Sequence, residues 1–153
     1  MNSLAALTVL LQRAETERDA AIGVLRQAEG LVAQAQAQAE QLTAYRQDFR
    51  VRWAERFRTA GTPELLHCRQ SFGQRLDAAI AHQATEAQHL SNRVTRAREV
   101  LLAREQRVAA VRKLIERRQA ELRRLADQRD QRATDEAAQR ALAVGAQRAA
   151  LQP

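Results

Sequence analysis

Histidine, cysteine and carboxylate side chains are the groups in this 153-residue chain that could bind a metal or act in catalysis. Of the three histidines, only His82 and His89 share a helical face, and no carboxylate is placed to complete a metal site with them. Cys68 is the single cysteine, so neither an intramolecular disulfide nor a Cys-x-x-Cys pair can form. A glycine-rich phosphate loop and an HExxH motif are also absent from the sequence. We therefore predict a protein that is not an enzyme and that holds no cofactor or metal.

Arginine offers a different chemistry, the binding of a negatively charged partner. Between Arg93 and Arg132 lie thirteen Arg or Lys and six Asp or Glu residues, an excess of +7 that equals the net charge of the chain. Such a block suits an acidic protein groove, nucleic acid or an anionic membrane surface. It also suits a solvated helix face on which arginines pair with carboxylates four residues further on, as Arg117 could with Glu121.

Aromatic side chains gather in one short part of the chain. The five rings are Tyr45, Phe49, Trp53, Phe57 and Phe72. One seam between two helices cannot bury all five, so we expect Phe49 and Trp53 in the core and Tyr45 and Phe57 outside it. An exposed apolar patch of this kind commonly marks a protein interface.

Two long helices would position these groups. Residues 3–60 and 64–143 contain no proline and carry apolar side chains at alternating steps of three and four, the heptad pattern of a coiled coil. Thirteen of fifteen stripe positions are apolar in the first block and twelve of fifteen in the second, against 45% for the whole chain. The stripes occupy positions 4, 7, 11, 14, 18, 21, 25, 28, 32, 35, 39, 42, 46, 49 and 53, and then 76, 80, 83, 87, 90, 94, 97, 101, 104, 108, 111, 115, 118, 122 and 125.

A turn at residues 61–63 would reverse the chain. We expect Gly61 to adopt a positive φ, Thr62 to cap the second helix and Pro63 to suit its first position. The predicted fold is therefore all-α, a long antiparallel two-helix coiled-coil hairpin.

Folding at residue 61 pairs residues whose numbers sum to about 122, so that Leu42 faces Ile80. In this register Arg18 faces Arg104, which is acceptable only if both side chains reach outward to nearby Glu15, Glu17 or Glu105. A register slipped by one heptad is the alternative.

The second helix is the longer one in this prediction. Its partner residues run out near 119, which leaves residues 120–143 without an intramolecular mate, followed by a flexible tail at about 144–153. An isolated helix of this length is marginal in water. We therefore expect the overhang to fray or to be held by a partner.

Composition excludes other classes of protein. Five glycines, two prolines and 3% aromatic residues do not support a β-sheet. The chain has no continuous apolar stretch of about 20 residues that could span a membrane, and its first residues lack a basic, signal-like region. A single domain over residues 1–153 in the cytosol is the expectation.

Three short sequences resemble the flagellar export protein FliJ family, a component of flagellar type III protein export. They are QLTAYR at residues 41–46, FGQRLDAAIAHQ at residues 72–83, and DQR at residues 130–132 followed by Asp135-Glu136. The resemblance covers most of the chain and rests on the order of these strings along a hairpin whose first helix is shorter.

The resemblance implies a stalk that supports flagellum assembly, similar in shape to the rotary shaft of F-type ATP synthases. Its open end would enter the hexameric export ATPase, and its tip would contact the cytoplasmic domain of the membrane export gate. It would thus associate peripherally with the inner face of the cell membrane at the flagellar base. The family is also described as escorting export chaperones, for which this sequence identifies no surface.

Residues for both contacts can be carried over from the resemblance. Those expected to contact the gate are Gln38, Leu42, Tyr45, Phe49, Phe72, Leu76, Ala79 and Gln83. Those expected at the ATPase ring are Arg117, Arg118, Arg123, Arg124, Arg129 and Arg132. Phe49 stands where the family commonly has tyrosine, and Gln83 where histidine can occur. Because Leu42, Phe49, Leu76 and Gln83 also lie on the stripe, core packing explains these four equally well.

Two other functions remain open at this point. The equivalent stalk of a virulence-type secretion system would share the hairpin. A basic coiled coil that binds nucleic acid or anionic lipid would show affinity that falls steeply with salt.

Overall fold

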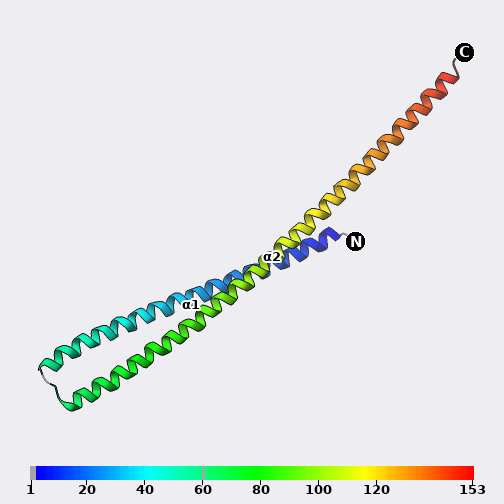
Figure 1. The fold of residues 1–153 in the computed structure, drawn as a ribbon. Helices are drawn as coiled ribbons and strands as arrows, with labels where there is room; N and C mark the ends of the chain where they lie inside the picture. The colour runs from blue at the N-terminus through cyan, green and yellow to red at the C-terminus, as the bar shows by residue number, and fades with distance from the viewer. Residues whose placement is uncertain (1–2, 60) are drawn as a thin grey trace. The chain divides into compact units, whose positions relative to one another are not determined.

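The computed structural model of the chain describes residues 3–59 and 61–153. They form two helices, α1 over Ser3–Thr59 and α2 over Pro63–Ala150 (Figure 1). No strand occurs among the described residues. The predicted all-α fold of two helices packed against each other, with the second helix longer, is confirmed.

The contacts divide the chain into two compact units, each containing a part of both helices. The turn unit is Thr16–Glu105, and the terminal unit combines Met1–Glu15 with Gln106–Pro153. In the turn unit the two helices run antiparallel, α1 ending at Thr59 and α2 beginning at Pro63. In the terminal unit the start of α1 packs antiparallel to α2.

Burial follows the predicted heptad stripe closely. All fifteen stripe positions of α1 are buried or half-buried, as are the first thirteen of α2. The two exceptions are Leu122 and Leu125, which are 40% and 38% exposed. They lie beyond the part of α2 against which α1 packs, so their exposure marks the end of the paired seam.

Small side chains dominate the most buried positions of α1. Ala14, Ala21, Ala28 and Ala35 repeat at intervals of seven, and none is more than 7% exposed. On α2 the most buried positions besides Leu76 are Val94, Ala97, Val108 and Val111, each at most 8% exposed. An alanine at every seventh position lets two helices approach closely, because the separation of packed helices depends on the side chains between them. We call residues 21–35 with the facing part of α2 the alanine seam.

Contacts between the helices agree with the predicted register. The residue numbers sum to 121 for Arg104 with Glu17 and for Phe49 with Phe72, and to 123 for Arg46 with Asp77. In the terminal unit, the hydrogen bond from Arg118 to Ser3 likewise gives 121. A slip of one heptad would move these sums by seven.

The predicted conflict between Arg18 and Arg104 is resolved by outward-turned side chains. Arg104 Nη1 lies 3.1 Å from Glu17 Oε2, and Arg18 Nη2 lies 3.0 Å from Asp19 Oδ1. The pairing of Arg104 with Glu17 was expected, whereas that of Arg18 with its neighbour Asp19 was not.

The turn differs from the sequence prediction at one residue. Thr62 caps α2 as expected, since its Oγ1 accepts a hydrogen bond from Leu65 N at 3.3 Å, and Pro63 is the first helical residue. The expectation for Gly61 was wrong, because no described glycine has a positive φ. A Cβ built on Gly61 would lie 3.4 Å from Phe57 Cδ1, an ordinary van der Waals distance.

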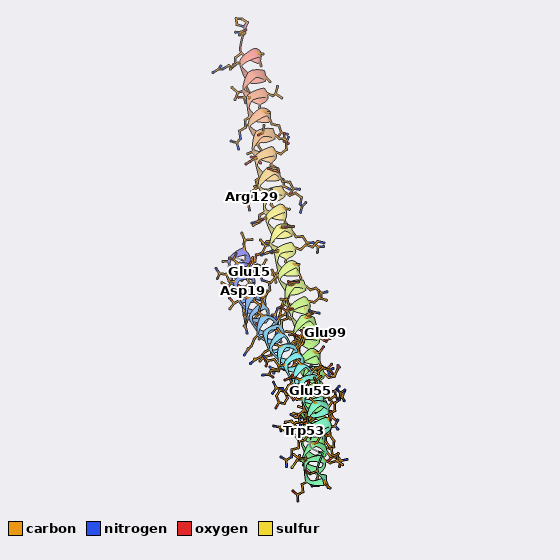
Figure 2. All side chains as sticks on the ribbon, turned by 90° about the vertical axis from the view of Figure 1, so that its left-hand side faces the viewer. Glu15, Asp19, Trp53, Glu55, Glu99 and Arg129 are labelled. Carbon is orange, nitrogen blue, oxygen red and sulfur yellow. The ribbon has the colours of Figure 1, made fainter. Side chains whose placement is uncertain are left out.

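The unpaired end of α2 is longer than predicted. Every residue from Gln119 to Pro153 is exposed, and the helix continues to Ala150 instead of ending near residue 143. Alanine and arginine, both strong helix formers, make up much of residues 137–150, so local propensity favours this continuation. We call residues 119–150 the free arm; in Figure 2 the side chains around Arg129 have no second helix beside them.

Candidate interaction surfaces

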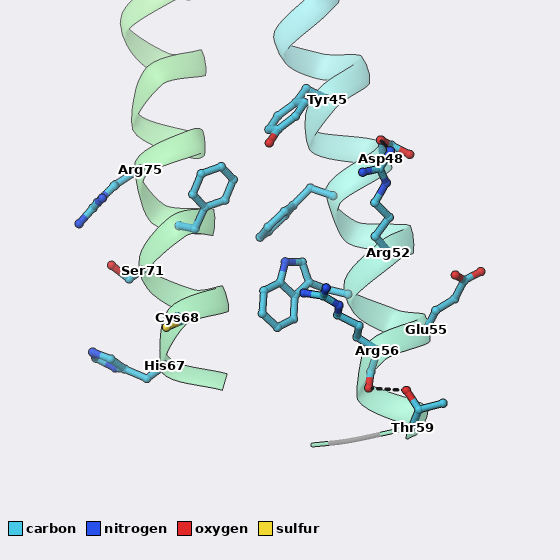
Figure 3. Close-up of a pocket in the computed structure, with 13 residues that line it drawn as sticks. Tyr45, Asp48, Arg52, Glu55, Arg56, Thr59, His67, Cys68, Ser71 and Arg75 are labelled. Carbon is cyan, nitrogen blue, oxygen red and sulfur yellow. Dashed lines mark hydrogen bonds and ion pairs between the residues drawn. The ribbon is translucent and has the colours of Figure 1, made fainter. Parts of the chain in front are cut away.

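A groove lies between the helices at the turn end of the turn unit. Its volume is about 910 Å³, and Figure 3 shows its walls, with Tyr45 and Arg56 on α1 and His67, Cys68 and Ser71 on α2. We call it the aromatic groove. Its lining residues are Tyr45, Asp48, Phe49, Arg52, Trp53, Glu55, Arg56, Thr59, His67, Cys68, Ser71, Phe72 and Arg75.

Five rings form a connected cluster at this groove, and all of them except Phe57 line it. Phe49 is its centre, with ring centroids 4.8 Å from Phe72 and 5.8 Å from Trp53. Tyr45 meets Phe72 edge-on at 6.3 Å, and Trp53 lies 6.4 Å from Phe57. Each such pair contributes roughly 0.5–1.5 kcal/mol beyond its buried area. The cluster therefore joins the helices where the alanine seam has ended.

The rings are only partly covered by the protein. Tyr45 and Phe72 are 53% and 38% exposed, while Phe49, Trp53 and Phe57 are half-buried. Over Phe57, the guanidinium carbon of Arg69 stands 5.6 Å from the ring centroid. Phe49 and Trp53 therefore do contribute to the packing, as expected, but apolar ring surface remains on the outside.

The eight residues predicted to contact the gate occupy three different settings. Tyr45, Phe49 and Phe72 come together in the aromatic groove. Leu42 and Leu76 lie half-buried and buried in the seam, and Ala79 is exposed on α2.

Gln38 and Gln83 contact each other across the two helices. Gln83 Nε2 donates to the Ala35 carbonyl oxygen at 3.2 Å and to Gln38 Oε1 at 3.3 Å. Both bonds lie at the end of the alanine seam. A polar side chain at a seam position specifies the register of a coiled coil. Through these bonds Gln83 therefore helps to align the two helices, which is a structural role.

Sequence reasoning missed the charged walls of the aromatic groove. Arg52, Arg56, His67 and Arg75 line it, and none was singled out from the sequence. The signal was present in the spacing, since Arg52 and Arg56 are four residues apart and so face the same side of α1. Between Tyr45 and Arg75 there are seven arginines and three carboxylates, so the turn end is basic as well.

The terminal unit has a smaller, apolar groove where α1 begins. Its volume is about 610 Å³, and it holds Leu10 and Leu114, which are 37% and 47% exposed. The full lining is Ser3, Ala6, Leu7, Leu10, Leu114, Arg117, Arg118 and Glu121.

The six arginines predicted for the ATPase ring divide between this groove and the free arm. Arg117 and Arg118 line the groove, where Arg118 donates to Ser3 Oγ at 3.0 Å and pairs with Glu121 at 2.8 Å. The other four, Arg123, Arg124, Arg129 and Arg132, are exposed on the free arm.

The positive charge lies mostly before the free arm. Residues 93–118 hold nine Arg or Lys and three Asp or Glu, an excess of +6, whereas the free arm itself holds six arginines and five carboxylates, an excess of +1. In the terminal unit, Arg112 uses its charge to pair with Glu15 at 2.9 Å. The free arm therefore carries positive and negative charges in nearly equal number, and the basic part of α2 is residues 93–118, before the free arm.

Among the described residues, no group of three or more His, Cys, Asp or Glu is arranged to hold a metal ion. Within residues 3–59 and 61–153, neither helix has a stretch long and apolar enough to cross a membrane.

Comparison with known proteins gives one match. No curated protein and no solved structure matches the chain. The family model of the flagellar FliJ protein matches residues 3–147, nearly the whole chain, in agreement with the resemblance seen in the sequence. The chain therefore belongs to the FliJ family, a component of flagellar protein export.

Proposed function

We propose that this protein is a non-enzymatic stalk of the flagellar export apparatus. It binds the hexameric export ATPase with the terminal unit and the membrane export gate with the turn end. Through these partners it associates with the inner face of the cell membrane. Its action is coupling of the two machines during export, since a coiled coil transmits force and position without chemistry of its own.

The free arm is the observation that supports this proposal most. All of its residues are exposed, although the helix continues to Ala150. A helix of this length is marginal in water without packing. At about 1.5 Å per residue, its 32 residues reach roughly 48 Å and offer alternating arginines and carboxylates to a partner.

Titration of the export ATPase tests the first contact. The full-length protein should raise the rate of ATP hydrolysis, and a version ending at Gln119 should not. A full-length variant with Arg123, Arg124, Arg129 and Arg132 changed to Gln keeps the length of the free arm and removes four of its positive charges. It shows whether stimulation depends on these charges or on the length of the helix. Equal stimulation by the full-length and shortened proteins would show that the free arm is not the contact, and no stimulation by either would detach the protein from the ATPase.

Binding to the cytoplasmic domain of the gate tests the second contact. The combined change Tyr45→Ala and Phe72→Ala removes the most exposed rings and should weaken binding while the helix content stays the same. The matched control is Val100→Ala with Leu102→Ala, two side chains of the turn unit that are 50% and 56% exposed and lie outside the aromatic groove. Unchanged binding by the ring variant would remove the turn end from the proposal.

A further inference from the structure

Four rings on α1 are evenly spaced, and three of them line the aromatic groove. Tyr45, Phe49, Trp53 and Phe57 follow one another at intervals of four, so they form one ridge on the helix. The ridge runs from Tyr45 to Phe57, twelve steps along the helix or about 18 Å. Phe72 closes it from α2 at 4.8 Å from Phe49. The result is a partly exposed apolar strip between two helical walls, a surface on which a third helix can pack.

The charges around the strip are distributed unevenly. In Figure 3 the side chain of Arg56 extends into the space between the helices, whereas Glu55 points away from α2. Arg52 is paired with Asp48 at 3.1 Å. Arg56 and Arg75 have no ion pair among the described residues. Arg75, which also lines the groove, points away from α1 in Figure 3. With Arg52 and Asp48 paired, the lining holds Arg56 and Arg75 against Glu55, an excess of one positive charge beside the rings.

We infer that the aromatic groove binds an acidic amphipathic helix of about three turns, supplied by the export gate. Its apolar side chains pack on Phe49, Trp53 and Phe72, and its carboxylates pair with Arg56 and Arg75. This inference rests on the proposed gate contact and deepens it. It moves the contact from the seam residues Leu42, Leu76 and Gln83 towards the turn, and it specifies the chemistry of the partner.

A helix fits this surface better than single-stranded nucleic acid does. Stacked bases need separate open ring faces. Here Phe49 already packs against both Trp53 and Phe72, and Arg69 covers Phe57. The ring edges and the groove between two helices remain, and those suit the side chains of a third helix.

Charge reversal with a matched control tests the inference. The probe is the purified cytoplasmic domain of the export gate, titrated against the full-length protein. Arg56→Glu with Arg75→Glu should raise the Kd about tenfold or more, because like charges would then face each other. Arg50→Glu with Arg58→Glu changes the net charge equally at exposed positions that do not line the groove, and it should change the Kd about twofold at most.

Cys68 reports directly on occupation of the groove. It is the only cysteine of the chain, it lines the groove, and it is exposed. Bound gate domain should slow its alkylation by N-ethylmaleimide. In a Cys68→Ser, Gln70→Cys variant the thiol stands on an exposed position outside the lining and should react at the same rate with or without the gate domain.

The outcomes separate this inference from the proposed function. Selective loss with the Arg56 and Arg75 pair, together with protection of Cys68, supports the inference. Equal loss with both pairs, or unprotected Cys68 while the wild type binds, overturns it and leaves the gate contact in place. Competition by an oligothymidylate for the groove would also overturn it. Failure of the wild type to bind the gate domain would overturn the gate contact and this inference together.

Discussion

The turn unit packs its two helices in two different ways. In the alanine seam, Ala21, Ala28 and Ala35 are at most 7% exposed, so these side chains are almost fully covered by the contact between the helices. At the turn end, the rings at 45, 49, 53, 57 and 72 connect the helices, yet Tyr45 remains 53% exposed. The small alanine side chains are almost fully covered where the two helices meet. The large rings also join the helices, but they leave apolar surface that is available to a partner.

Exchanging the two kinds of packing should have the largest effect. Ala28 is 4% exposed, so Ala28→Phe would force a ring into the alanine seam and lower the free energy of unfolding by about 3 kcal/mol or more. Urea unfolding followed by circular dichroism measures this. Ala33→Phe, at an exposed position of the same helix, should change the free energy by only about 0.5 kcal/mol. Similar losses in the two variants would contradict close packing in the alanine seam.

Replacing a large ring by a small side chain at the turn end should lower the free energy of unfolding by a smaller amount. Phe49→Ala removes the ring that contacts both Trp53 and Phe72, and the expected loss is about 2 kcal/mol because the ring is only half-buried. The fluorescence of Trp53, the single tryptophan, should shift towards the red as water reaches it. A loss as large as that of Ala28→Phe would mean that the turn end is packed like the alanine seam.

Gln83 marks where one kind of packing gives way to the other. Gln83→Leu should change the free energy of unfolding by about 1 kcal/mol at most, since Ala35 and Gln38 lose only one bond each. The larger effect should be on the register, because a polar side chain at a seam position specifies how the two helices are aligned. In a Cys68→Ser background, Leu42→Cys should cross-link with Ile80→Cys, and Gln83→Leu should allow additional cross-linking of Leu42→Cys with Ala87→Cys. Absence of the second cross-link would show that the register does not depend on Gln83.

Gly61 should give the smallest effect, and a favourable one. Its φ is not positive, and a Cβ would meet Phe57 at an ordinary distance of 3.4 Å. Gly61→Ala should therefore raise the free energy of unfolding by about 0.5 kcal/mol, because it restricts the unfolded chain. A decrease of the melting temperature would show that the turn needs the freedom of glycine.

Most of the fold could be predicted because a heptad stripe encodes both the buried face and the partner helix. The charged residues on the stripe also fit the predicted register, because Arg18 and Arg104 turn outward to Asp19 and Glu17. The end of α2 was harder to predict. Gly145 is the residue near position 143 that could end a helix, yet it is accommodated within α2, and no proline or apolar pattern marks a boundary there.

The surfaces could be predicted only in part. The clustering of rings in the sequence identified the turn end, but it did not show that Arg56 and Cys68 share a groove with them. That requires knowing how the faces of the two helices are rotated towards each other. The excess of +7 over residues 93–132 likewise did not show that the free arm carries only +1. The sequence count does not take into account the residue at which α2 loses contact with α1.

The complete exposure of the free arm also has an evolutionary consequence. No residue from Gln119 onward is constrained by packing within the chain. Mutations there should accumulate freely unless another molecule selects against them, whereas almost any change at Ala28 adds atoms where there is no room. Positions of the free arm that stay invariant among related proteins would therefore trace the outline of whatever this helix touches.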